Sequence, residues 1–535
     1  MSSHKFNSAH RLAAYGHKGA AQKEQMHNRA QDRREHAAIA VVFLVAIVLR
    51  FYGLPDQGLR TSDGGHYAHQ AWKVLQGHEK GIKDKPGHTL LIVISFKLLG
   101  LKMSSPLFMS AVSGLAFILF TWLLVRRRFG RAAGLFTAAL VAATPYFLFY
   151  HRGANADANL LTFLTGGLLL YDRVLDTSPA DGKKYFGWAI GSGMAFGFSL
   201  SVNYSMATTF VPVCLAFLIH SVRQHREHWR RILLCILVVI AGFATGYAIP
   251  CAILWPYIEH EELFRQVIYH QQGFRESAFS FRFLLMPVKY AGAPFVLLGA
   301  IGVWRMAVSR RPFEIFVLVQ LGLMVLGYCR SVLPYPRVYL PLCLPLLFGC
   351  AAAFQFIWVS LNESRQPRIL AVAVSLMLCI GFQARELYGA VTLHSGYEEA
   401  MSRLLADGDA FKAGGTTHTW WVFEAFTGRR FGFASDLLAA KFATPDWHER
   451  APALFRSFRR QGYTHIVLDY MLWNRLKVEH NHRLEQFLKL HPPTHTIPNR
   501  AAGHEQTVAE DGGLPVAGTN PLSEFIYIWR LSEFQ

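Results

Sequence analysis

AAIAVVFLVAIVLRFYGL, residues 37–54, followed by RTSDGGHYAHQAWKVL, residues 60–75, decides the fold of this chain. The first stretch is apolar and long enough, as a helix, to cross roughly 30 Å of hydrocarbon. The second carries an acid, Asp63, close to the point where the chain leaves the apolar segment. A membrane helix that ends beside a carboxylate raises the question of what that carboxylate does.

The composition of the whole chain indicates a membrane protein. Of its 535 residues, 52% are hydrophobic and 14% aromatic, which is more than a soluble globular chain usually carries. The formal net charge is +19, but Lys and Arg occur in short clusters between apolar runs, as in the cytoplasmic loops of membrane proteins. We therefore expect no nucleic-acid partner. The seven cysteines lie inside apolar segments without any metal-binding spacing, so they are expected to be core residues.

Eleven transmembrane spans fit both the apolar runs and the positions of the basic clusters. They are 37–54, 104–125, 132–150, 156–173, 185–202, 205–221, 231–254, 284–304, 313–332, 338–360 and 367–385. The apolar run 88–101 is too short for a comfortable crossing, and counting it would place the basic clusters on both sides. We therefore predict an interfacial or re-entrant helix at 88–101, a cytoplasmic N-terminus and a C-terminus outside.

These segments predict three regions. Residues 1–36 are polar and basic without an apolar core, which indicates a cytoplasmic tail and not a cleaved signal peptide. Residues 37–390 form the mainly α, polytopic membrane domain, and residues 391–535 an extracytoplasmic soluble α/β domain. In the latter we expect strands at 416–426, 429–435, 464–470 and 525–531, helices at 395–408, 451–462 and 480–490, and a loop at 499–520. No glycine pattern there indicates nucleotide binding.

The predicted outer loops collect polar side chains that the spans lack. Ionisable groups at the membrane are costly unless they are used or paired, so they are candidates for function. The set comprises Asp63, Asp84, Lys85, Arg152, Asp157, Glu259, Arg265, Arg275 and Arg337, with His66, His69, His88, His151 and His270. The near absence of charge inside the spans argues against an ion-coupled transporter, which needs carboxylates at mid-membrane.

The order of the motifs resembles a known family. The motifs are SDGGHYAHQAWKVLQG, KPGHTLL, SFKLLG, a paired-arginine turn, HRGANADANLLTFL and PYPRVYLPLCLPLLFG. Over about residues 37 to 390 this order resembles the polyprenyl-phosphate-sugar-dependent glycosyltransferases of the GT-C fold, in the branch of protein O-mannosyltransferases and aminoarabinose transferases. The resemblance implies an inverting transfer of sugar from a lipid-phosphate carrier to a hydroxyl at the outer membrane face.

The resemblance assigns catalytic roles to two acids. Asp63 matches the family's catalytic acid and would act as the general base for the acceptor hydroxyl. The alternative is a helix N-cap, and the two roles are compatible. The family usually has a second acid beside this aspartate, where this chain has Gly64 and Gly65. Because one possible metal ligand is missing, the resemblance does not favour dependence on a metal. Asp157 matches the second acid of the pattern, with a favourable position at a helix N-terminus as the alternative.

The resemblance also suggests how the donor is held. The leaving lipid phosphate needs fixed cations, and Lys85 and Arg337 match by position. Snorkelling to ordinary headgroups is the alternative for Arg337, although arginine is depleted on the outer face. Arg152 and His151 are further candidates for the phosphate. The predicted sugar contacts are His66, Tyr67, Tyr269, His270, Gln271, Arg275 and Tyr339, of which Tyr269 to Arg275 belong to an amphipathic segment at 255–283.

Two functional classes stay open from sequence. One is a glycosyltransferase of the bacterial inner membrane whose partners are a polyprenyl-phosphate-linked sugar, membrane lipids and a hydroxyl acceptor that is lipid, glycan or protein. The other is a transporter or flippase of a lipid-linked sugar. No cofactor is expected, and a divalent metal stays open.

Overall fold

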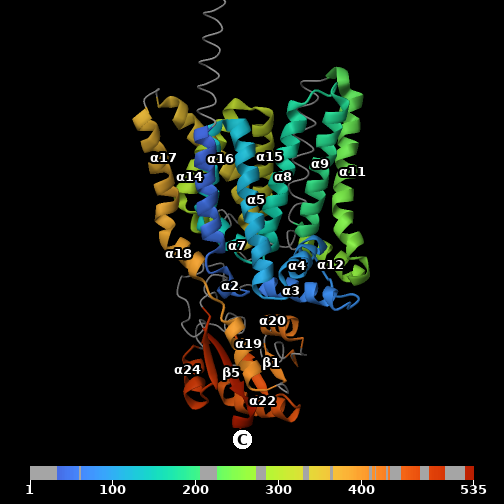
Figure 1. The fold of residues 1–535 in the computed structure, drawn as a ribbon, viewed down its shortest axis with the longest axis vertical. Helices are drawn as coiled ribbons and strands as arrows, with labels where there is room; N and C mark the ends of the chain where they lie inside the picture. The colour runs from blue at the N-terminus through green and yellow to red at the C-terminus, as the bar shows by residue number, and fades with distance from the viewer. Residues whose placement is uncertain are drawn as a thin grey trace, which may run out of the picture.

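The computed structural model describes twelve stretches of the chain. They are 33–59, 62–204, 226–272, 285–328, 336–361, 365–408, 412–415, 417–428, 432–433, 447–469, 481–499 and 525–534. A tall bundle of helices makes up most of them, and a smaller unit containing a β-sheet lies against one end of the bundle (Figure 1).

Each predicted span has a helical counterpart except 205–221, which lies outside the described residues. The counterparts are the helix of residues 33–51, α5 (Ser104–Phe129), α6 (Arg131–Ala143) with α7 (Pro145–His151), α8 (Ala156–Asp176), α9 (Gly182–Val202), α11 (Trp229–Ile253), α13 (Leu285–Ala291) with α14 (Ala293–Ser309), α15 (Pro312–Tyr328), η5 (Pro336–Leu342) with α16 (Cys343–Ser360), and α17 (Arg365–Ile380). Among the described helices, four are long and apolar enough to cross a membrane unaided, and a fifth span results if the bent pair α6 and α7 counts as one. The number eleven stays a prediction.

The bend between α6 and α7 has a local cause. The two helices meet at 61° around Thr144, and Pro145 opens α7. Proline has no backbone N–H and its ring crowds the preceding turn, so the helix breaks just before it. The bend turns α7 across the bundle, so that His151 and Arg152 end deep in the protein instead of at its rim.

Glycines allow α9 and α11 to pack with their backbones in contact. Gly193 and Gly197 on α9 face Gly242 and Gly246 on α11. A Cβ added at Gly197 would overlap the carbonyl oxygen of Phe243, so only glycine permits this approach. Pairs of small residues four apart are typical of helix contacts inside membranes, where packing and not water exclusion holds helices together.

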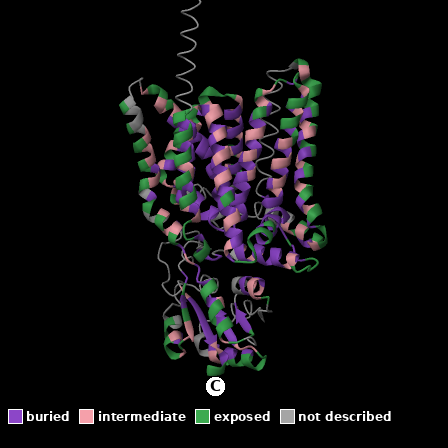
Figure 2. Cartoon of the chain, in the orientation of Figure 1, coloured by how far each residue is buried: buried purple, intermediate pink, exposed green. Residues whose placement is uncertain are grey.

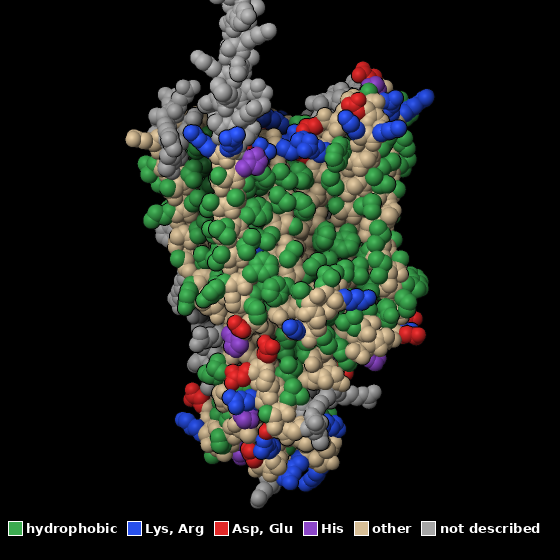
Figure 3. Space-filling model, viewed as in Figure 1, with side chains coloured by type: hydrophobic (Ala, Val, Ile, Leu, Met, Phe, Trp, Pro, Cys, Tyr) green, Lys and Arg blue, Asp and Glu red, His purple; other side chains and the backbone are tan. Residues whose placement is uncertain are grey.

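The charged and apolar surfaces of the bundle are separated. Lys and Arg side chains gather at the end opposite the C-terminal unit, and hydrophobic side chains dominate the wall between the two ends (Figure 3). At the basic end, Arg127 and Arg128 at the end of α5 pair with Asp172 and Asp176 at the end of α8. An apolar wall with a basic rim identifies a multi-pass membrane protein.

Short helices collect at the opposite end of the bundle. They are α2 (Leu54–Gln57), α3 (Ser62–Leu75), α4 (Pro86–Leu99), the 3-10 turn η3 (Trp255–Tyr257) and α12 (His260–Gln272). In Figure 1 they lie between the long helices and the C-terminal unit. The predicted short helix at 88–101 corresponds to α4, whose 14 residues reach about 21 Å and so fall short of a full crossing.

The C-terminal unit is a five-stranded mixed sheet with helices around it. Its helices are α19 (Tyr397–Ala406), α20 (Thr417–Thr427), α22 (Trp447–Arg460) and α24 (Asn481–Leu490), with a short 3-10 turn at Leu531–Glu533. Helix α18 (Ala384–Thr392), preceded by a 3-10 turn at Gly381–Gln383, follows α17 and packs against α7 of the bundle (Figure 1). The strands are β1 (Ala413–Gly415), β2 (Gly432–Phe433), β3 (His465–Leu468), β4 (His495–Pro498) and β5 (Phe525–Arg530), in the order β2-β1-β3-β5-β4. The pairs β2/β1 and β1/β3 are parallel, and β3/β5 and β5/β4 are antiparallel with Val467 opposite Ile528. Figure 2 shows the central strands buried.

One predicted strand is wrong. Residues 417–426 of the aromatic stretch 416–426 belong to the helix α20, in which Val422, Phe423 and Ala425 are buried. Aromatic composition favours strands only weakly, and tertiary packing overrides it. The predicted strands at 464–470 and 525–531 contain β3 and β5, and the predicted loop 499–520 lies almost entirely outside the described residues.

Candidate functional site

Helix α3 presents the predicted base at the end of the bundle nearest the C-terminal unit. Tyr67, Ala68, Ala71 and Trp72 are buried, and this apolar stripe fixes which face of α3 lies on the bundle. Asp63 lies in the first turn, half-buried, where the helix dipole favours a carboxylate. Its charge acts on His88 of α4, which lies on the next helix along the chain.

Asp84, just before α4, is the most heavily hydrogen-bonded acid of this region. It accepts hydrogen bonds from Gln70 Nε2 at 2.7 Å, His66 Nε2 at 3.2 Å and the Tyr67 hydroxyl at 3.4 Å, all on α3. Thr89 donates to the Gln70 carbonyl at 3.1 Å, which orients the amide toward Asp84. The carboxylate therefore fixes the register of α3 against α4.

The environment of Asp84 keeps it ionised. Burial alone would raise the pKa of its carboxyl, but the hydrogen bond from His66, the charges of His66 and Lys85 and the hydrogen bond from Gln70 together lower that pKa well below its usual value. A charged acid behind His66 orients its imidazole.

Lys85 occupies a strained position at the start of α4. Its φ is 45°, in the left-handed region that non-glycine residues rarely adopt, and Pro86 follows. Its backbone N–H donates to the Tyr204 hydroxyl at 3.1 Å, and its ammonium lies 5.2 Å from the centre of the Tyr67 ring. Strain that the surroundings hold in place is frequent at functional sites, and here it directs a buried cation onto the helix that carries Asp63.

Asp157 is tied to the same region through residues 203 and 204. It lies in the first turn of α8, is 4% exposed, and accepts a hydrogen bond from Asn203 Nδ2 at 2.7 Å. Tyr204, the next residue along the chain from Asn203, holds the backbone of Lys85. The second predicted acid and the predicted phosphate ligand therefore share one connecting segment.

His88 links three helices beneath these groups. Its ring makes an edge contact with Tyr67 of α3, with centroids 4.7 Å apart. Its Nε2 lies 3.3 Å from the Ala154 carbonyl oxygen and its Nδ1 lies 3.2 Å from Asn159 Nδ2 of α8. One nitrogen donates and the other accepts, so the imidazole is set in its neutral tautomer and joins α3, α4 and α8.

Helix α20 of the C-terminal unit covers α3. The Trp421 ring lies 4.6 Å from that of His66, Glu424 approaches His69 Nε2 at 3.3 Å, and Phe426 packs on Phe96 of α4. In Figure 1 α20 lies directly across the face of α3. The polar groups around Asp63 and Asp84 are therefore enclosed between the membrane helices and a soluble unit.

Two of the predicted phosphate ligands have other partners. Arg152 is fully buried and its guanidinium donates to the carbonyls of Leu49, Tyr52 and Val391 at 2.8 to 3.0 Å and to Gln57 Oε1 at 3.1 Å. His151 is also fully buried. Its Nδ1 donates to the Phe147 carbonyl at 2.8 Å, and its ring stacks on Phe117. Both side chains are enclosed by protein partners, and their assignment to the donor phosphate stays a prediction.

Other predicted contacts are placed only by their backbone. Arg337 and Tyr339 belong to η5, which packs against α8; the Arg337 side chain lies outside the described part, and Tyr339 is buried. Tyr269, His270 and Gln271 belong to α12, but their side chains, and the whole of Arg275, are also outside it. The segment before α12 is tied to the site, since Ile82 exchanges two backbone hydrogen bonds of 2.8 Å with Tyr257 and Glu259.

The sequence-based prediction missed several residues of this region. Gln70, Asn203, Tyr204, Trp421 and Glu424 were not singled out, and Asp84 was noticed without a role. The spacing of Gln70 four residues after His66 on an amphipathic helix was the available signal. In the described part of the chain no group of three or more His, Cys, Asp or Glu side chains is arranged to hold a metal ion.

Solved structures with the same arrangement define the fold class. The crystal structure of ArnT from Cupriavidus metallidurans bound to undecaprenyl phosphate superposes with a TM-score of 0.58 at 16% identity, over 81% of this chain and 93% of that one. The Archaeoglobus fulgidus oligosaccharyltransferase superposes with a TM-score of 0.56 at 12% identity, over 82% of this chain and 70% of that one. The chain therefore has the GT-C membrane fold.

Sequence comparison points in the same direction over a shorter stretch. The family described as dolichyl-phosphate-mannose-protein mannosyltransferase matches residues 83–247. A polyprenol-phosphate-mannose–protein mannosyltransferase from Mycolicibacterium smegmatis is 27% identical over 202 residues. That match covers 32% of this chain and 38% of the relative. The matched stretch contains Asp84, Lys85 and Asp157 and begins after Asp63.

Proposed function

We propose that the chain is an inverting glycosyltransferase that moves a sugar from a polyprenyl-phosphate donor to a hydroxyl acceptor. The observation that supports the proposal is the meeting of α3, the start of α4 and the start of α8 at one end of a membrane bundle, since these are the segments that carry Asp63, Lys85 and Asp157. The GT-C fold and the relatives named for polyprenol-phosphate-mannose support it.

The proposed chemistry uses this chain's own residues. The Asp63 carboxylate takes the proton of the acceptor hydroxyl as its oxygen forms a bond to the anomeric carbon. The bond from that carbon to the donor phosphate breaks on the opposite face, so the configuration inverts and a lipid monophosphate leaves. The Lys85 ammonium stabilises the charge that grows on this phosphate, in surroundings that exclude water. No cofactor takes part in this proposal, and turnover is expected to survive chelation of divalent metals.

The proposal includes an orientation. Basic residues gather at the end opposite the C-terminal unit, and such residues favour the cytoplasm (Figure 3). The site and the C-terminal unit then lie on the outer face of the inner membrane, where a lipid-linked sugar and a water-soluble acceptor can meet.

The decisive experiment compares two variants, in each of which one aspartate is replaced by asparagine. Asp63→Asn is expected to lower sugar transfer by about 10²- to 10⁴-fold while the protein still folds and binds undecaprenyl phosphate. Asp56→Asn is the control, because Asp56 is also in the first turn of a helix but is exposed. Transfer is measured by mass spectrometry of envelope glycans and lipids in a deletion strain that carries each variant. Turnover retained by Asp63→Asn removes Asp63 as the base, and unchanged glycans and lipids in the deletion strain overturn the transferase proposal.

A further inference from the structure

We propose that the basic end of the bundle holds a specific anionic phospholipid, with one acyl chain inside a cavity between the helix of residues 33–51, α6, α16 and α17. The cavity has a volume of about 710 Å³. It lies at the opposite end from the Asp63 region and takes no part in the proposed transfer, so this inference is independent of it.

The wall of the cavity is apolar and rigid. Its lining includes Val42, Leu135, Phe136, Trp358 and Leu376. The Phe136 ring stacks on Phe354 with centroids 4.2 Å apart and nearly parallel planes, and Phe354 in turn contacts Trp358. A stacked aromatic wall does not collapse into an adjacent space easily, so the cavity stays available to an apolar guest.

The position of the cavity makes lipid the guest. The helix of residues 33–51 exposes Val41 (61%) and α17 exposes Leu370 and Met377, so both helices border the hydrocarbon. From Arg131 to Ala139, which both line it, the cavity extends eight residues along α6, about 12 Å. That depth corresponds to most of one leaflet, as one acyl chain would need.

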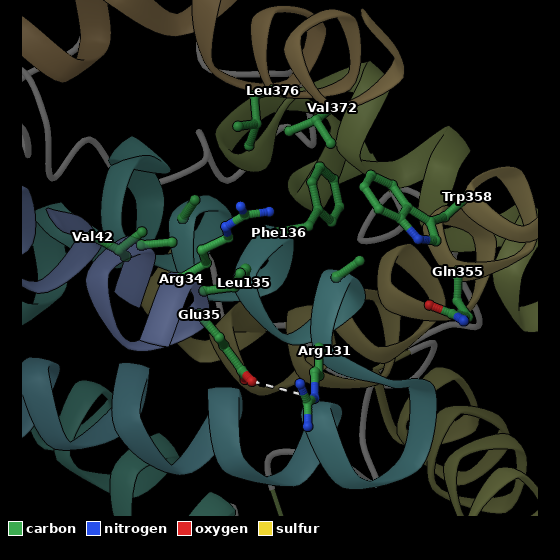
Figure 4. A pocket seen from close by; sticks show the side chains of 13 residues that line it. Arg34, Glu35, Val42, Arg131, Leu135, Phe136, Gln355, Trp358, Val372 and Leu376 are labelled. Carbon is green, nitrogen blue, oxygen red and sulfur yellow. Dashed lines mark ion pairs between the residues drawn. The ribbon is translucent and has the colours of Figure 1, made fainter. Parts of the chain in front are cut away.

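The mouth of the cavity favours an anionic headgroup. Among the residues that line it, Arg34 and Arg131 are basic and Glu35 is acidic. The Glu35 carboxylate is already shared by Arg126 at 2.6 Å and Arg131 at 3.5 Å, which leaves the mouth with an excess of positive charge. Figure 4 shows the Arg34 guanidinium reaching over the cavity toward Phe136, with Glu35 and Arg131 joined below it. A phosphate at this depth would accept from these guanidinium groups.

A single amide in the wall fits the glycerol part of such a lipid. Gln355 lines the cavity, and its Oε1 is buried without a hydrogen-bond partner in the described chain. A hydroxyl of a glycerol headgroup can donate to this oxygen when the lipid phosphate lies at Arg34 and the acyl chain runs toward Leu376. The three features together select a phosphodiester with a tail, and a free phosphate would leave the apolar volume unfilled.

The test titrates the delipidated full-length protein with dioleoyl-phosphatidylglycerol and, separately, with dioleoyl-phosphatidylcholine, followed by native mass spectrometry. We expect one tightly bound phosphatidylglycerol per chain and about tenfold weaker binding of phosphatidylcholine. Arg34→Gln should weaken phosphatidylglycerol about tenfold, whereas Arg33→Gln, which removes the same charge one position away from the lining, should not.

A second pair of variants tests the acyl-chain cavity. Ala139→Phe fills the lining and should abolish the tight adduct, whereas Val48→Phe adds the same bulk on the exposed outer face and should leave it unchanged. Equal binding of the two lipids, equal effects of the two arginine variants, or a tight adduct that survives Ala139→Phe would each overturn the inference.

Discussion

Asp84 holds α3 and the start of α4 together in the candidate site, and it has no role in the proposed sugar transfer. Its three hydrogen-bond donors all come from one helix, and its neighbour Lys85 is the proposed phosphate ligand. Burying a carboxylate is costly unless its oxygens are satisfied, so this cluster must form as a unit. The sequence draws attention to Asp63 and Lys85 because they stand in recognisable motifs. It could not predict the role of Asp84, because its partners lie 14 to 18 residues earlier and only the packing of α3 on α4 brings them together.

The first prediction concerns Asp84→Asn. The variant is expected to unfold at lower temperature, with a loss of about 1 to 3 kcal/mol at pH 7, because an amide presents a donor to the donors of Gln70 and Tyr67. The folded pKa of Asp84 is depressed, so its stabilisation is present above the ordinary value of 3.8 and is lost as the pH falls below it. Thermal unfolding in micelles at pH 7, 5 and 3.5 should therefore give a constant difference that shrinks only at 3.5. A difference that shrinks between pH 7 and 5 would contradict this.

At the scale of elements, sequence patterns predict some helices of the C-terminal unit but not α20. Amphipathic periodicity correctly predicts α19, α22 and α24, because each buries one stripe against its own sheet. In α20, Trp421 and Glu424 contact α3. Val422 and Phe423, the two residues between them, are buried on the other side of the helix. Such two-sided burial removes the helical signal, and a partner more than three hundred residues earlier cannot be seen locally.

The second prediction is that acid weakens the contact between α3 and α20. Burial, the largest influence, lowers the pKa of His69 despite the hydrogen bond to Glu424. The folded pKa is thus below the ordinary 6.5, so the unfolded chain binds more protons, and stability is complete above pH 6.5 and falls below it. Melting temperatures at pH 7.5 and 5.5 should differ less for His69→Gln than for the parent protein. His78→Gln, at an exposed position, should keep the parental difference; equal pH dependence in all three proteins would argue against the role of His69.

At the scale of the whole molecule, one buried arginine lies where the chain passes from the bundle to the C-terminal unit. Arg152 bonds the end of the helix of residues 33–51 and the carbonyl of Val391, at the entry to the C-terminal unit. Around it, Ser395 N–H donates to the Gln57 carbonyl at 2.9 Å. The sequence predicts a multi-pass membrane protein, because hydropathy and charge act locally along the chain. It does not predict this connection, because the three partners are 100 residues before and 239 residues after Arg152.

The last prediction concerns that connection. Arg152→Met keeps the length and packing of the side chain but leaves three carbonyls without donors, so we expect a loss of about 3 kcal/mol in unfolding free energy. Because Val391 is then released, the segment 391–396 should also be cleaved faster in limited proteolysis, a change that general destabilisation of the bundle would not confine to this segment. Arg403→Met is the control, since that exposed arginine makes one surface pair with Glu399 and should change stability by less than about 0.5 kcal/mol. If Arg152→Met melts and is cleaved like the parent protein, the other contacts between the two units, from Ser395 to Gln57 and from α20 to α3, suffice to fix the C-terminal unit over the site.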